Sequence, residues 1–212
     1  MINNKAFMNV PEDTRYVAKL EYHLVTFDPA RAAPGLVFGQ QNTLVTQNVP
    51  DLGFKVAMGR DGWSSGRHFF AFNIIDCGAG NRIMIGVSDG TRSSTYQLGH
   101  YPGLMPDGVS YGSDGYKYSL DANSFCGRYW PRNSALFGSA YQSQAEVGVL
   151  LDMEFHTVTF YNNGRRVGTA AGSNIILGES VYYPAVSLYA LGATLISLPY
   201  NDVKILSDGD VL

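Results

Sequence analysis

Two carboxylates, those of Asp152 and Glu154, stand two positions apart in the stretch VGVLLDMEFH. Residues i and i+2 of a β-strand point to the same side, so this spacing would place both carboxylates on one face. Paired carboxylates supply the acid and the nucleophile in many glycosidases. A third acid at matched spacing is missing, because position 150 is Leu150. We therefore expect Asp152 and Glu154 to be structural acids near a turn, and a glycan-binding or glycan-hydrolysing sandwich is the alternative.

The histidines and cysteines show no metal-ligand spacing in the sequence. They are His23, His68, His100, His156, Cys77 and Cys126. His68 belongs to an aromatic run, which predicts a structural histidine. The segment TRSSTY lacks the Gly-x-Ser-x-Gly context of a nucleophile elbow, and GRDGWSSG matches no phosphate-binding loop. The sequence therefore predicts no enzyme, no metal site and no cofactor.

The composition is typical of an all-β protein with many turns. Of 212 residues, 24 are Gly and 14 are Tyr, while only 16% are charged. The net charge of -3 argues against a nucleic-acid binder that works by bulk charge. No apolar run approaches the ~18 residues of a membrane span, and we expect no membrane insertion. We expect an intracellular protein, cytoplasmic or nuclear, with reduced thiols.

Turn dipeptides recur between short strand-like runs. The turns are Asp61-Gly62, Asp89-Gly90, Asp107-Gly108, Asp114-Gly115, Asn163-Gly164 and Asp208-Gly209. The runs include RHFFAFNII, RIMIGVS, VGVLLDM, TVTFY, YYPAVSLY and ATLISL. Many short strands separated by turn signals predict a sandwich or barrel. The spacing of βαβ units is absent, so a parallel α/β fold is not expected.

The segment TVTFYNNGRRVGTA predicts a hairpin with a type I′ turn, because Asn163 and Gly164 both tolerate positive φ. A two-residue loop pairs Asn162 with Arg165, Tyr161 with Arg166, Phe160 with Val167 and Val158 with Thr169. Alternation puts Val158, Phe160 and Val167 on a dry face with Thr169 beside them, and Thr157, Thr159, Tyr161 and Arg166 on a wet face. The hairpin is therefore predicted to cover a core with one side.

The first 35 residues have no single predicted structure. Residues 12–27 fit a helix, because Tyr16, Leu20, Leu24 and Phe27 lie near helical spacing, and they also alternate as a strand. Residues 28–35 read as a loop or linker. We expect residues 1–35 to be an extension packed on the domain, and residues 201–212 to be a short tail.

Several segments, taken in order, resemble SPRY domains. They are LVFGQQNTLVTQ, SGRHFFAFNI, IGVSDG, YGSDGYKYS, VGVLLDMEFHTVTFYNNGRRVGTA and YYPAVSLYALGATLISL. The resemblance covers residues 36–200 and implies an antiparallel two-sheet β-sandwich of concanavalin-like jelly-roll topology with little helix. Ala145 and Glu146 stand where the family usually has Gly-Asp, and the segment CGRYWPRNSALFGSAYQSQ is longer than expected.

The resemblance implies a non-catalytic module that binds a peptide or folded protein through loops at one end of the sandwich. Such a module is an adaptor or scaffold, a subunit of a larger assembly, or the substrate-recognition part of a ubiquitin ligase. No RING or SOCS-box-like segment is visible in the sequence, so we expect a fragment or a stand-alone adaptor.

Aromatic and arginine side chains in the predicted loops are the candidate partner contacts, because Trp, Tyr and Arg dominate binding hot spots. They are Trp63, Tyr96, Tyr101, Arg128, Tyr129, Trp130, Arg132 and Tyr189. The resemblance places Trp63, Tyr101 and Tyr189 at the family's binding loops, as neighbours of the Trp130 segment in one partner surface, although Trp63 and Tyr189 fit the interior of a sandwich equally well. Tyr129, Trp130 and Arg132 favour exposure, because Pro131 and two arginines do not suit a buried strand.

Overall fold

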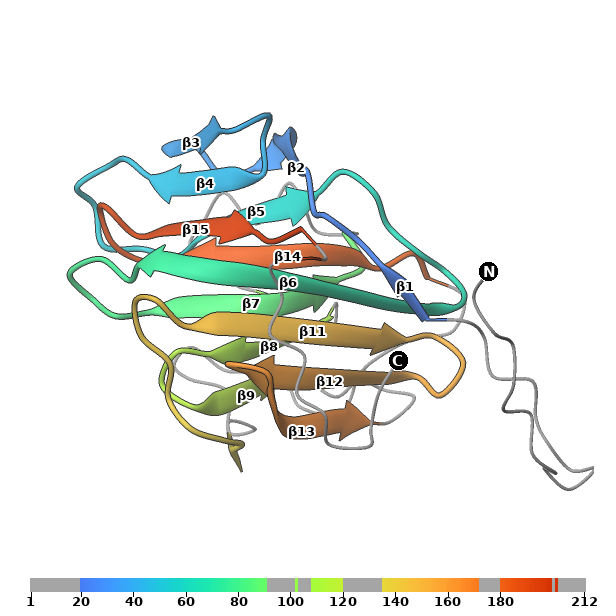
Figure 1. The fold of residues 1–212 in the computed structure, drawn as a ribbon. Coiled ribbons are helices and arrows are strands. Elements are labelled where there is room, and N and C mark those ends of the chain that lie inside the picture. Colours follow the sequence, from blue (N-terminus) through green and yellow to red (C-terminus); the bar gives the residue numbers. More distant parts are fainter. Residues whose placement is uncertain are drawn as a thin grey trace, which may run out of the picture.

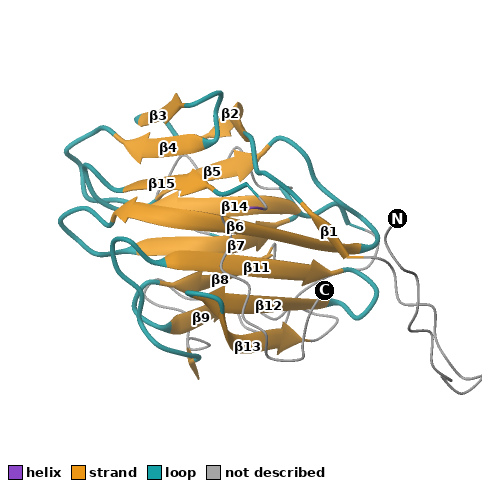
Figure 2. Cartoon of the chain, in the orientation of Figure 1, coloured by secondary structure: helices purple, strands orange, loops and turns teal. Residues whose placement is uncertain are grey.

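The computed structural model describes residues 20–90, 102, 108–119, 135–171, 180–199 and 201. Every named element in these ranges is a β-strand, as Figure 2 shows. The strands form two sheets packed face to face (Figure 1), and nearly all pairings are antiparallel. The expected all-β sandwich is therefore confirmed.

The first sheet contains the first and the last strands of the described residues, together with strands from the middle of the chain. Its order is β13 (Arg165–Ala171), β12 (Thr157–Asn162), β11 (Glu146–Asp152), β6 (Arg67–Asp76), β15 (Thr194–Ser197), β4 (Leu44–Gln47) and β3 (Leu36–Gly39). β1 (Leu20–Tyr22) joins it by pairing in parallel with the start of β6. β15 pairs with the later part of β6, so β1 extends the same side of that strand.

The second sheet covers the other side of the core. Its order is β10 (Ala135–Leu136), β9 (Tyr116–Ser119), β8 (Gly108–Gly112), β7 (Ile83–Ser88), β14 (Tyr183–Leu188), β5 (Lys55–Gly59) and β2 (Phe27–Ala32). Consecutive segments such as β7 and β8, or β8 and β9, are antiparallel neighbours. The expected early strand pair is also present in the first sheet, as β3 and β4.

The core lies between the inner faces of the two sheets. On β6 the alternate residues Phe70, Phe72 and Ile74 are fully buried and belong to the main core cluster. Because residues two apart share a strand face, His68 lies on this same face, at the end of the apolar stripe. His68 is 5% exposed, so a histidine rather than an aliphatic side chain occupies the last buried position of β6 at this end.

The hairpin of β12 and β13 has the predicted turn but not the predicted register throughout. Asn163 and Gly164 have φ of 49° and 76°, as a type I′ turn requires. Asn162 pairs with Arg165 and Tyr161 with Arg166, as expected. A bulge then shifts the pairing, so that Phe160 faces Gly168, Thr159 faces Thr169 and Val158 faces Ala170.

The ring of Phe137 lies against the shifted position. A Cβ at residue 168 would lie 2.9 Å from that ring, so a larger residue opposite Phe160 would require the ring to move. The Phe137 and Phe160 rings then pack edge to face with centroids 5.9 Å apart. The placement of Thr169 beside the dry face is therefore wrong. Thr169 lies opposite Thr159, with the two Oγ1 atoms 2.7 Å apart.

The prediction of a loop over residues 28–35 is wrong for most of that segment, because Phe27–Ala32 forms β2. Pro29 suggested a loop, but β2 is an edge strand, where proline is tolerated. Its pairing with β5 is irregular and includes a register shift. β2 brings Phe27 into the core, where it stacks on Phe72 with centroids 5.8 Å apart.

Candidate functional site

The sandwich has two ends, and the two described aromatic candidates lie at different ones. The Trp63 end is where β6 and β14 begin and where the β11–β12 turn lies, on the right in Figure 1. Trp63 forms an isolated bridge with Tyr182, directly before β14. Tyr189 follows the last residue of β14, about 20 Å away at ~3.3 Å per residue. The structure does not bring Trp63 and Tyr189 together.

Trp63 is half-buried and closes the core at its end of the sandwich. Its ring stacks on His68 with centroids 4.5 Å apart and an interplanar angle of 12°. It also contacts His23, at 4.4 Å, and Phe70, at 6.1 Å. Both readings of the sequence therefore apply to Trp63, because one side of the ring packs on the core and part of it remains accessible.

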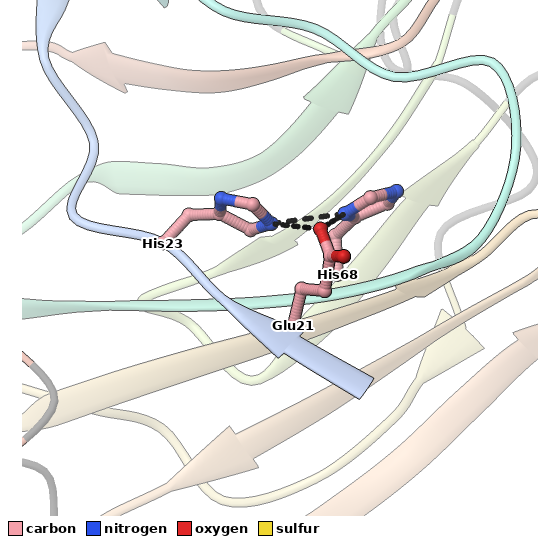
Figure 3. Close-up of side chains that lie close together, drawn as sticks. All are labelled: Glu21, His23 and His68. Atoms are coloured by element: carbon pink, nitrogen blue, oxygen red, sulfur yellow. Dashed lines mark hydrogen bonds and ion pairs between the residues drawn. The ribbon is translucent and has the colours of Figure 1, made fainter. Parts of the chain in front are cut away.

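Glu21, His23 and His68 form a cluster (Figure 3), and its two imidazole rings contact Trp63. The parallel pairing of β1 and β6 sets Glu21 directly opposite His68, and the backbone N–H of His23 donates to the carbonyl of Phe69. His23 Nε2 lies 2.9 Å from His68 Nδ1. Glu21 Oε2 lies 3.8 Å from the first nitrogen and 3.9 Å from the second.

The hydrogen bonds of the cluster define which nitrogens carry protons. His68 Nε2 lies 2.7 Å from the carbonyl oxygen of Ser65, which can only accept, so Nε2–H donates. The neutral ring of His68 then has its lone pair on Nδ1, where it accepts from His23 Nε2–H. Burial, and next the proximity of His68, lower the pKa of His23, against the opposing effect of Glu21 and Asp61.

The sequence did not single out Glu21 or His23, and it predicted no metal site. The strand reading of residues 12–27 puts both residues on one face, which is the only local signal. Their partner His68 follows 45 positions after His23, and only the β1–β6 register brings the rings together. The expectation for His68 itself is met, because its ring is buried and hydrogen-bonded at both nitrogens.

Tyr189 is held by neighbours at the opposite end of the sandwich. Its ring packs edge to face on Phe54, with centroids 5.0 Å apart, and the guanidinium of Arg82 lies 5.2 Å from the ring centroid. Its backbone carbonyl accepts from Gly53 N–H and from the side-chain amide of Gln47. Tyr189 therefore has packing roles that need no partner.

The other six candidates lie outside the described residues. They are Tyr96, Tyr101, Arg128, Tyr129, Trp130 and Arg132. β7 and β8, which border the first of these segments, and β9, which precedes the second, reach the Trp63 end. Ser88 closes β7 and Gly108 opens β8, and Ser88 pairs with both Gly108 and Tyr183. β9 ends at Ser119, opposite Val109 of β8.

Asp152 and Glu154 do not lie on one strand face, where the sequence spacing would place them. Asp152 is the last residue of β11, and Glu154 lies in the following turn. Asp152 is 5% exposed, and its Oδ2 accepts from Arg67 Nε at 2.9 Å. Its Oδ1 accepts from the backbone N–H groups of Glu154 and Phe155. The expectation of structural acids near a turn therefore agrees with this geometry.

Exposed apolar side chains occur at both ends. Leu24, Phe155 and Val181 are 49%, 52% and 39% exposed at the Trp63 end, and Leu52 and Leu191 are 72% and 49% exposed at the other. Apolar exposure alone does not distinguish the two ends. Within the described ranges no helix is long and apolar enough to span a bilayer.

Comparison with known proteins defines the family. A family model of the SPRY domain matches residues 67–197, so the chain belongs to the SPRY domain family. Human SPRY domain-containing protein 3 is 29% identical over 130 residues, which cover 59% of this chain and 26% of that protein. The E3 ubiquitin-protein ligase TRIM9 of Drosophila melanogaster is 29% identical over 176 residues, covering 77% of this chain and 20% of the ligase.

The solved structures agree with this assignment at the level of the fold. A crystal structure of a human SPRY domain superposes with a TM-score of 0.59 at 22% identity, covering 77% of this chain and 94% of that domain. The chain therefore spans most of a solved SPRY domain but only about a quarter of the curated relatives that it matches.

Proposed function

We propose that the protein is a non-catalytic recognition module that binds a peptide or a folded protein through the Trp63 end of its sandwich. The observation that carries the proposal is the convergence of chain segments at this end. Trp63 lies there, and β7, β8 and β9, which lead into or out of the segments of the six further candidates, also reach this end of the sandwich. Loops on a rigid sandwich are the usual place for recognition.

The partner is a protein rather than a nucleic acid or a membrane. The net charge of -3 gives no bulk attraction to phosphate. Trp, Tyr and Arg are the side chains that anchor protein interfaces. Within the proposal the module works inside the cell, as an adaptor or as a subunit of a larger assembly. The likeness to the ligase TRIM9 supports a role in choosing substrates for ubiquitin ligation.

Affinity capture with paired variants tests which end of the sandwich carries the partner. Val181→Asp puts a charge at the Trp63 end, at a side chain that is 39% exposed. Arg165→Glu changes the opposite end, where Asn162, Arg165 and Arg166 line a hollow of ≈ 550 Å³. We expect Val181→Asp to lose a partner that the wild type and Arg165→Glu both retain. Loss with Arg165→Glu alone would reject the assignment.

Once that partner is identified, Trp130→Ala measures the contribution of the segment CGRYWPRNSALFGSAYQSQ to binding. If Trp130 is a hot spot, we expect a loss of at least ~2 kcal/mol of binding free energy with a nearly unchanged melting temperature. Unfolding of the variant, with normal affinity per folded molecule, would place Trp130 in the core instead.

A further inference from the structure

The geometry points to a binding site for one zinc ion at Glu21, His23 and His68, which would fasten β1 to β6 beneath Trp63. The three donor atoms are His23 Nε2, His68 Nδ1 and Glu21 Oε2, and they face one another (Figure 3). Two imidazoles and a carboxylate are a ligand set that Zn²⁺ accepts, and three protein ligands leave a fourth position for water.

The donor atoms lie close enough together for one ion to reach all three after a small adjustment of the side chains. They form a triangle with sides of 2.9, 3.8 and 3.9 Å, and the point equidistant from its corners lies about 2.1 Å from each atom. Zn–N bonds are about 2.0–2.1 Å long, and Zn–O bonds about 2.0–2.2 Å. Tetrahedral coordination at these bond lengths places donor atoms about 3.3–3.4 Å apart, so binding widens the 2.9 Å gap between the two nitrogens by a few tenths of an ångström and draws Glu21 Oε2 closer.

The hydrogen bond at His68 Nε2 orients the ring so that its other nitrogen, Nδ1, can bind the ion. Its Nε2–H donates to the carbonyl oxygen of Ser65 at 2.7 Å, and this bond leaves the Nδ1 lone pair aimed into the cluster. A histidine ligand whose other ring nitrogen donates to a carbonyl is the usual outer-shell arrangement of zinc sites. Trp63 stacks on the ring and restricts its rotation.

When the ion binds, the proton of the His23 ring must move from Nε2 to Nδ1. Without the ion its Nε2–H donates to His68 Nδ1. Binding displaces that proton, and the ring stays neutral by carrying one proton on Nδ1. The ion then takes the place of the proton between the two nitrogens, while Glu21, whose side chain is 60% exposed, turns its carboxylate onto the ion.

The surroundings suit a cation. Glu21 and Asp61 supply negative charge beside His23, although burial, and next the proximity of His68, outweigh them and lower the pKa of that ring. A cavity of ≈ 30 Å³ lined by His23, Asp61 and Trp63 adjoins the cluster. This exceeds the ~10–15 Å³ that one water molecule needs, so solvent reaches the edge of the site.

Calorimetric titration of the full chain with Zn²⁺, after treatment with a chelator, tests the proposal. We expect one ion per chain for the wild type. Loss of a direct ligand in His23→Gln or Glu21→Gln should weaken binding by more than the about 10–100-fold that outer-shell changes cost. His156→Asn is the matched control, because Asn tolerates the φ of 53° at that turn, and it should bind as the wild type does.

A second readout places the ion beside Trp63. In a Trp130→Phe background Trp63 is the only remaining tryptophan. Bound Co²⁺ should quench its fluorescence, and Zn²⁺ should restore the fluorescence by competition. The His23→Gln version of this variant should show neither effect. Absence of Zn²⁺ binding by the wild type, or equal binding by wild type, His23→Gln and Glu21→Gln, would overturn the proposal.

Discussion

Asp152 stabilises the turn between β11 and β12 with both of its carboxylate oxygens. Oδ2 accepts from Arg67 Nε at 2.9 Å, and Oδ1 accepts from the N–H groups of Glu154 and Phe155 at 3.1 and 3.0 Å. Asp152→Asn keeps an oxygen for the turn and loses the ion pair, so we expect a loss of about 1–2 kcal/mol in unfolding free energy. Asp152→Ala loses both, and we expect about 2–4 kcal/mol.

Urea denaturation of both variants measures these losses. Glu154→Gln is the control, because that side chain is exposed and the change should stay within about 0.5 kcal/mol. A null effect of Asp152→Ala would show that neither interaction supports the fold, and would reopen the question of what this carboxylate does.

Cys77 is predicted to be unreactive in the folded protein. Its side chain is 4% exposed, and burial raises the pKa of the thiol, outweighing a hydrogen bond with Ser143 that acts in the opposite direction. The thiolate is the nucleophile, so a raised pKa and poor access both slow alkylation. Peptide mass spectrometry after iodoacetamide should find Cys77 largely unmodified in buffer and modified in guanidinium. Equal labelling in both would contradict its burial.

Residue types alone revealed part of the candidate site. Trp63 was identifiable because a tryptophan after an Asp-Gly turn stands out in a loop. The structural role of Asp152 was also expected. The cluster of Glu21, His23 and His68 could not be predicted, because it depends on a parallel pairing between strands whose histidines are 45 positions apart.

At the scale of elements, the β12–β13 hairpin depends on its turn. Gly164 has φ of 76°, where a β-branched side chain is strained, so we expect Gly164→Val to lower the unfolding free energy by about 1–3 kcal/mol. Gly53→Val is the matched control, because a Cβ there meets nothing within 4 Å and its φ is not positive.

Thermal unfolding of the two valine variants makes the comparison. Arg166→Ala in the same hairpin should stay near neutral, because the side chain is exposed and its hydrogen bond with Thr169 is at the surface. Equal melting temperatures for Gly164→Val and Gly53→Val would contradict the need for positive φ at this turn.

Elements were predictable where the signal was local. The Asn-Gly turn and the alternating strands on both sides of it are examples of elements with such a local signal. The bulge that moves Gly168 opposite Phe160 packs against the ring of Phe137, a residue from outside the hairpin, so no local pattern shows it. β2 was hidden because Pro29 reads as a loop, and only the edge position of the strand permits a proline there.

At the scale of the whole molecule, the sandwich gives the chain two ends with different properties. One end combines Trp63, the cluster of Glu21, His23 and His68, and the entry points of the segments with the remaining candidates. The other has Tyr189 packed between Phe54 and Arg82. The sandwich architecture followed from turn spacing and resemblance, but which loops share an end required the strand pairing.

The most direct test of the account is to locate partner contacts by photo-crosslinking in cells. Benzoylphenylalanine would replace Phe155 at the Trp63 end or Leu191 at the opposite end, two side chains that are 52% and 49% exposed and therefore equally accessible. The account predicts a discrete protein crosslinked from position 155 and absent from position 191. The same protein crosslinked from position 191, with none from position 155, would contradict the assignment of the Trp63 end.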